Sequence, residues 1–70
     1  MENKVQLIVN GETLEFQKEV TLVDIMKKLD VEGQVMATAV NMEVVKQDTW
    51  DQYRPVDGDK IEMLQFVGGG

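Results

Sequence analysis

The chain opens with apolar and polar residues in alternation. In the segments 4–9 and 12–16 every second residue is apolar, which is the period of a half-buried β-strand. These apolar positions are Val5, Leu7, Val9, Leu14 and Phe16. Between the segments stand Asn10 and Gly11, a pair that favours a type I′ turn because both positions need positive φ. The start of the chain therefore predicts a β-hairpin.

The next segment has helical spacing instead. Its apolar residues fall on one face of a helix: Leu22, Ile25, Met26 and Leu29. Thr21 can cap the start of this helix, with Asp24 three residues later as in a capping box. Lys27 and Lys28 stand in the last turn, where positive charge interacts favourably with the helix dipole. With Gly33 as its end, the segment predicts one amphipathic helix of about three turns.

Three apolar segments in the second half of the chain predict further strands. They span residues 35–40, 44–45 and 61–66, and turns at 41–42 and 57–59 separate them. The irregular stretch before the second turn holds two aromatic residues that we expect to cover one end of the core: Trp50 and Tyr53. Because one helix can cover only one face of the sheet, the predicted fold is an α+β domain of two layers.

Composition and charge remove most kinds of enzyme. The 70 residues include no cysteine, no histidine and no serine. The chain therefore lacks the nucleophiles of Ser and Cys triads, the usual proton shuttle near neutral pH and the commonest metal ligand. Thirteen acidic against seven basic residues give a net charge of −6, which argues against a nucleic-acid-binding face. We expect a protein that is not an enzyme and holds no cofactor or metal of its own.

The sequence predicts neither a membrane segment nor a calcium loop. No apolar run of about 18 residues occurs, and the first residues do not resemble a signal peptide, so a cytoplasmic location is expected. Asp57, Asp59 and Glu62 lack the spacing of a calcium-binding loop, and a solvated turn is the simpler interpretation.

Three of the six glycines stand together at the end of the chain. Gly68, Gly69 and Gly70 follow the last predicted strand, and the carboxylate of Gly70 is the functional group that they carry. Most chain ends are frayed, and a terminal Gly-Gly alone would have that simple interpretation. Its combination with the preceding elements is more informative.

In this order and at this length, the chain resembles the ubiquitin-like β-grasp family and, within it, the ThiS-type sulfur carrier proteins. The matching stretches are Asn10-Gly11, Ala39-Val40-Asn41, Glu43-Val44-Val45, Trp50, Asp57-Gly58-Asp59-Lys60-Ile61-Glu62 and Val67-Gly68-Gly69-Gly70. The resemblance implies a mixed sheet of four to five strands with one main helix packed on one face. It also implies a β-grasp domain at residues 1–67 and a flexible tail at residues 68–70.

The implied chemistry takes place on the carboxylate of Gly70. In the family, a ThiF-like adenylyltransferase uses ATP and magnesium to convert this carboxylate to an acyl-adenylate. A sulfur donor such as a cysteine desulfurase then supplies the sulfur of a thiocarboxylate. The thiocarboxylate donates that sulfur in thiamin biosynthesis, with thiazole synthase as a partner. The resemblance therefore assigns catalysis to the partners and the flexible part of the tail to Gly68 and Gly69.

Two positions depart from the family pattern. Met42 follows Asn41 where Asn-Gly is common, so the second hairpin needs either strained backbone geometry or a different turn. Lys46 and Gln47 stand where the family often has Pro-Arg, so a partner contact made by that arginine is not expected here.

The last strand also suggests a surface for a partner. Alternation places Ile61 and Met63 under the helix and leaves Leu64 and Phe66 on the opposite face. Because the first and last strands pair in a β-grasp fold, we expect Ile8 to lie beside them. Scattered surface hydrophobes are common and need no function. The alternative favoured here is a docking patch of Ile8, Leu64 and Phe66 that leads toward the tail.

Two other functions remain open at this point. The small subunit of molybdopterin synthase shares the fold, tail and chemistry but delivers sulfur to a pterin precursor. Those subunits tend to be longer and often carry proline before the final glycines, where this chain has Phe66-Val67-Gly68. A β-grasp interaction module with an inert tail belongs to a different class, and it would tolerate residues added after Gly70.

Overall fold

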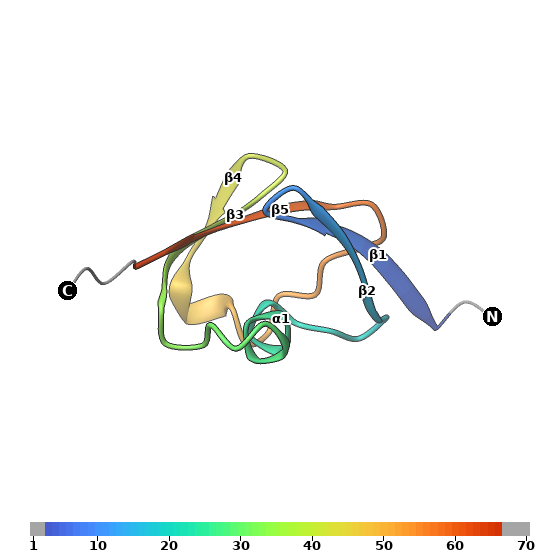
Figure 1. The fold of residues 1–70 in the computed structure, drawn as a ribbon, viewed down its shortest axis with the longest axis horizontal. Helices are drawn as coiled ribbons and strands as arrows, with labels where there is room; N and C mark the ends of the chain where they lie inside the picture. The colour runs from blue at the N-terminus through green and yellow to red at the C-terminus, as the bar shows by residue number, and fades with distance from the viewer. Residues whose placement is uncertain (1–2, 67–70) are drawn as a thin grey trace.

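The computed structural model describes residues 3–66, which form a five-stranded sheet with one α-helix on one face (Figure 1). The elements in chain order are β1 (Lys4–Val9), β2 (Glu12–Gln17), α1 (Leu22–Lys28), β3 (Val35–Val40), β4 (Glu43–Val45), the 3-10 helix η1 (Gln47–Thr49) and β5 (Lys60–Gln65). The strand order is β2-β1-β5-β3-β4, with β1 and β5 parallel and the other pairs antiparallel. The predicted α+β fold with a mixed sheet is confirmed.

The first hairpin has the register that alternation predicts. Val5, Leu7 and Val9 are buried, and β1 pairs with β2 along its whole length. In the turn, Asn10 has φ 50° and Gly11 has φ 85°, as a type I′ turn requires. The local pattern of residues is therefore sufficient to specify this element.

The second hairpin uses the same kind of turn without a glycine. Val40 pairs with Glu43, and between them Asn41 has φ 52° and Met42 has φ 73°. Of the two possibilities left open for this turn, the structure therefore has the strained one. Left-handed backbone brings Cβ close to the following carbonyl oxygen, which destabilises a residue other than glycine by about 1–2 kcal/mol.

The asparagines of the two turns each accept a hydrogen bond from the backbone of the middle strand β5. The backbone N–H of Met63 donates to Asn10 Oδ1 at 2.8 Å, and the backbone N–H of Lys60 donates to Asn41 Oδ1 at 3.0 Å. Asn41 Nδ2 also donates to Asp59 Oδ1 at 3.0 Å, which ties the second hairpin to the turn before β5. Side chains thus satisfy strand N–H groups that the short ladders beside β5 leave without a partner.

The helix begins where predicted and ends earlier. Thr21 and Asp24 form a reciprocal capping box, with bonds of 3.0 and 3.1 Å between each backbone N–H and the other side chain. α1 has 7 residues, about two turns rather than three. The chain leaves the helix through Asp30 at φ 61°, and the N–H of Val31 donates to the Met26 carbonyl at 2.9 Å.

This arrangement is a Schellman motif with aspartate at the position where glycine is usual. Gly33, the predicted end of the helix, lies in the following turn at φ 89°. The prediction was therefore wrong because it searched for the glycine that commonly occupies this left-handed position.

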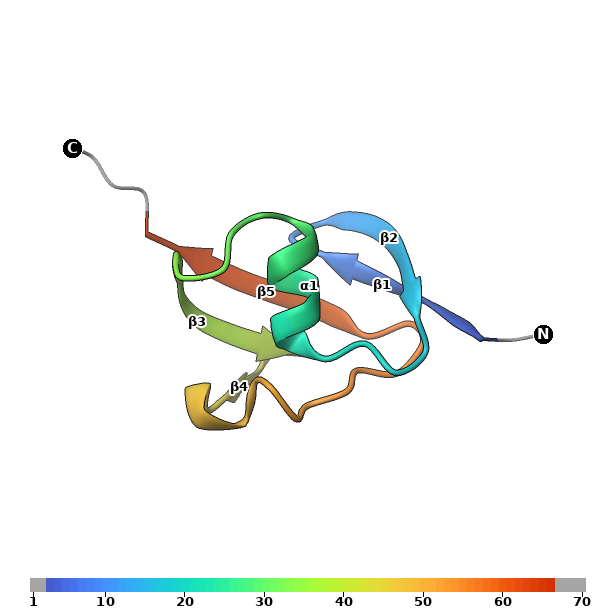
Figure 2. The ribbon, with the colours of Figure 1, turned by 90° about the horizontal axis from the view of Figure 1, so that it is seen from below.

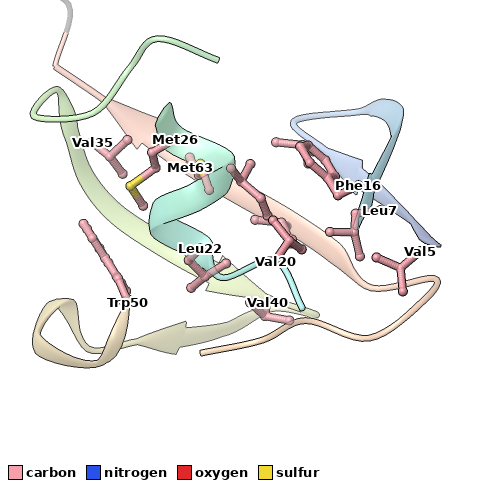
Figure 3. Close-up of a cluster of buried hydrophobic side chains, with 13 residues drawn as sticks. Val5, Leu7, Phe16, Val20, Leu22, Met26, Val35, Val40, Trp50 and Met63 are labelled. Atoms are coloured by element: carbon pink, nitrogen blue, oxygen red, sulfur yellow. The ribbon is translucent and has the colours of Figure 1, made fainter. Parts of the chain in front are cut away.

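The core lies between α1 and the inner face of the sheet (Figures 2 and 3). Its fully buried hydrophobic residues are Leu7, Leu22, Ile25 and Ile61. Trp50 is buried and donates from Nε1 to the Val45 carbonyl at 2.9 Å, and Tyr53 packs against the same cluster. These two aromatic residues cover one end of the core, as predicted. In residues 3–66 no helix is long and apolar enough to cross a membrane.

Candidate functional site

The strand that leads to the terminal glycines is the middle strand of the sheet. β5 lies between β1 and β3, and α1 crosses in front of it in Figure 2. At its end the N–H of Phe66 donates to the Gln34 carbonyl at 2.7 Å, so neighbouring backbone holds the chain up to this residue. Gly68, Gly69 and Gly70 lie outside the described residues. The structure thus places the base from which the tail starts.

Two of the three predicted docking residues are exposed, one in β5 and one just beyond its end. Leu64 and Phe66 are 60% and 63% exposed, and Leu64 lies on the face opposite α1, while Met63 and Ile61 are buried beneath the helix. This arrangement matches the predicted inward and outward faces of β5.

Ile8 does not lie beside Leu64. It is half-buried, and in the parallel pairing of β1 with β5 it lies opposite Lys60. Lys60 precedes Leu64 by four residues, which is about 13 Å along a strand. Glu62 stands between them on the outer face. The expected pairing of first and last strands occurs, but its register separates Ile8 from the other two residues.

The apolar surface around Leu64 continues onto β3 and β4 instead. Ala37 lies opposite Leu64, and Ala39 pairs with Val44 on one side and Glu62 on the other. A shallow hollow of about 260 Å³ lies among these side chains. We call Ala37, Ala39, Val44 and Leu64 the outer apolar face, and the exposed Phe66 follows Leu64 by two residues. Sequence reasoning missed its β3 and β4 members because alanines give a weak signal and a three-residue strand shows no clear period.

Exposed hydrophobic residues gather on this half of the molecule. Five of the six large hydrophobic residues exposed among residues 3–66 come from β3, β4, their turn and the end of β5: Met36, Met42, Val44, Leu64 and Phe66. By contrast, alternation leaves mainly polar residues on the outer side of β1 and β2: Lys4, Gln6, Thr13, Glu15 and Gln17. An exposed apolar cluster with a polar neighbourhood is typical of a protein-binding surface.

The acidic residues before β5 make structural hydrogen bonds. Asp57 Oδ1 accepts from the backbone N–H of Gln6 at 2.7 Å, and Asp59 Oδ2 accepts from the backbone N–H of Val56 at 2.9 Å. Within residues 3–66 no three His, Cys, Asp or Glu side chains are grouped so that they could hold a metal ion. These carboxylates therefore order the turn before β5.

A small β-grasp domain, with an apolar outer face beside the strand that leads to the glycines, defines a ubiquitin-like protein. The model of the ThiS family matches residues 3–70, and the chain belongs to that family. A solved structure of the thiamine biosynthesis protein ThiS from Geobacter metallireducens superimposes with a TM-score of 0.74 and 28% identity. The alignment covers 94% of this chain and all of that one.

Curated relatives agree with this assignment. The sulfur carrier protein ThiS of Escherichia coli is 27% identical over 66 residues, covering 94% of this chain and all of the relative. That of Bacillus subtilis is 28% identical over 65 residues, covering 91% of this chain and 98% of the relative. A thiazole synthase from Paramagnetospirillum magneticum is 33% identical over 66 residues, and the match spans only 20% of that relative's length.

Proposed function

We propose that this protein is a sulfur carrier of thiamin biosynthesis whose Gly70 carboxylate becomes a thiocarboxylate. The observation that carries the proposal is the family match over residues 3–70, which includes all three terminal glycines. Two relatives that the chain covers almost completely are named sulfur carrier proteins, which supports the same function.

The chemistry requires activation because a carboxylate is a poor electrophile. An oxygen of the Gly70 carboxylate attacks the α-phosphorus of ATP, and pyrophosphate leaves. A sulfur nucleophile then attacks the carbonyl carbon of the acyl-adenylate, and AMP departs with the original oxygen. A persulfide donor forms an acyl disulfide first, and a thiol reductant cleaves it to the thiocarboxylate. The net result is the replacement of one oxygen by sulfur.

The carrier supplies the reacting carboxylate and the means to present it. Gly68, Gly69 and Gly70 have no Cβ, so a chain of this sequence can enter a channel too narrow for other residues. ATP, magnesium and the catalytic groups belong to a ThiF-like adenylyltransferase in the cytoplasm. A cysteine desulfurase serves as the sulfur source.

We assign the outer apolar face as the surface to which the adenylating enzyme binds. Leu64 and Phe66 precede the tail directly, so an enzyme that holds the Gly70 carboxylate in its active site comes close to this face. Glu62 lies among the apolar residues and would match a basic group on the partner, which favours correct orientation. Ile8 lies outside this face and remains a separate predicted contact.

The acceptor of the sulfur is a thiazole synthase. The support is the relative of that name, in which a sequence similar to this chain makes up one fifth of a longer polypeptide. A carrier-like sequence in the same chain as a protein of that name supports thiazole synthase as the enzyme that receives the sulfur.

The proposal is tested by intact mass spectrometry after incubation with ATP, an adenylating enzyme and a sulfur source. We expect a species with one oxygen replaced by sulfur, mapped to Gly70 by fragmentation. A variant with one alanine added after Gly70 is the matched control and should stay unmodified. If the protein stays unmodified while the Escherichia coli carrier is converted in the same mixture, the chain is an interaction module and the proposal fails.

A further inference from the structure

The turns of the two hairpins have similar positive φ values but different second residues. Asn10 and Gly11 have φ values of 50° and 85°, and Asn41 and Met42 have φ values of 52° and 73°. Each asparagine also accepts a hydrogen bond from a backbone N–H of β5. The first turn is therefore an internal reference for the second, and it shows that glycine serves this geometry.

Met42 gains no packing within the described chain that would offset its strained backbone. Met42 is 86% exposed, the highest exposure among the large hydrophobic residues of 3–66. A left-handed φ is unfavourable for a residue with a Cβ and easy for glycine. The turn requires the positive φ, but nothing in the described fold requires methionine at that position, which points to a use of its side chain outside the fold.

The position of the turn suggests what that use is. In Figure 1 the β3–β4 hairpin rises on the side of the sheet opposite α1, which is the side of the outer apolar face. Val44, 78% exposed, belongs to that face and follows Met42 by two residues. Methionine is unbranched and polarizable, and it adapts to irregular apolar pockets. The turn that carries Met42 thus lies on the same side of the sheet as this face.

We propose that Met42 is a partner-contact residue that inserts into an apolar pocket of the enzyme that adenylates Gly70. This inference rests on the proposed function. Val40 pairs with Ile61, so the turn lies near the start of β5, about 17 Å along the strand from Phe66. A partner interface of standard size, about 800 Å² on each side, spans that distance. One enzyme can therefore hold the base of the tail and Met42 together.

The test separates stability from docking. In Met42→Gly we expect Tm to rise by about 4 °C because the strain is relieved. The same variant should show a KM for the carrier about tenfold higher, with kcat unchanged, in an assay of pyrophosphate release. Met42→Leu keeps an apolar side chain and should resemble the original protein in both measurements. Met42→Asn tolerates the turn but is polar, so its KM should also rise.

Gly11→Met is the matched control on the other hairpin. A Cβ built on Gly11 meets no atom within 4 Å, so this variant adds only the strain. We expect its Tm to fall by about 4 °C and its KM to stay unchanged. An unfolding effect cannot explain higher KM in a more stable variant and normal KM in a less stable one.

Three results would overturn the inference while leaving the proposed function intact. The first is an unchanged KM in Met42→Gly, and the second is a lower Tm in that variant. The third is a dimer of the original protein in size-exclusion chromatography that Met42→Gly converts to a monomer, which would assign the face to a second copy of the chain. Failure of the original protein to be adenylated would instead refute the proposed function.

Discussion

Replacement of Thr38 by valine should stabilise this protein. Thr38 lies on β3 with its side chain on the inner face of the sheet and only 1% exposed. Its Oγ1 has no hydrogen-bond partner among the described residues. Valine has the same branched shape and favours strands, so Thr38→Val exchanges a hydroxyl for a methyl with little change in packing.

The magnitude follows from the two groups exchanged. A buried hydroxyl without a partner costs about 1–3 kcal/mol on the scale of protein mutations. A buried methyl in its place contributes up to about 0.8 kcal/mol. We therefore expect the free energy of unfolding to rise by about 1–3 kcal/mol, which is large for a domain of 70 residues. The corresponding rise in Tm is roughly 5–15 °C.

The assay is urea denaturation followed by the fluorescence of Trp50, the single tryptophan of the chain, which is buried in the folded state. The midpoint should move to higher urea with an unchanged m-value, because the surface exposed on unfolding stays the same. Thr13→Val is the matched control. Thr13 is exposed on β2, so the same exchange should change stability by no more than about 0.5 kcal/mol.

A destabilised Thr38→Val variant would refute the reasoning. That result would mean that Oγ1 makes a hydrogen bond in solution, for example to a buried water, and that the methyl group leaves its partner unsatisfied. Equal stabilisation by both valine variants would also refute it, because strand propensity rather than burial of the hydroxyl would then be the cause.

Three other substitutions test the helix end, the core and the docking surface. Asp30→Gly should stabilise the fold by about 0.5–1 kcal/mol in urea denaturation, since Asp30 has φ 61°; a loss would show that its side chain has a role. Trp50→Phe should destabilise by about 1–3 kcal/mol because it leaves the Val45 carbonyl without the indole N–H; circular dichroism melting will detect this. Leu64→Asp should weaken binding to the adenylating enzyme at least tenfold by calorimetry, with a change in stability within about 0.5 kcal/mol. If Leu64→Asp unfolds the protein, the assignment of inward and outward faces on β5 is wrong.

Local features of the sequence determined several parts of the fold. Alternation specified the inward residues of β1 and β5, the Asn10-Gly11 pair specified the first turn, and the spacing of Thr21 and Asp24 specified the helix start. The turn and the helix start rest on contacts within a few residues, and alternation indicates which side of a strand is apolar, so short patterns describe all of them. The end of the helix was predicted wrongly because Asp30, with φ 61°, occupies the left-handed position where glycine is usual.

The outer apolar face could not be derived in the same way. Alternation assigned Leu64 to the outer face, but which residues surround it depends on strand register. The β1–β5 register places Ile8 opposite Lys60, and the β3–β4 pairing brings Val44 beside Ala39. Register is set by contacts between residues far apart in the chain, so only the tertiary structure decided which residues form the outer apolar face. The role of the Gly70 carboxylate, by contrast, is a prediction from the sequence and its resemblance to the family, because this residue lies outside the described part of the chain.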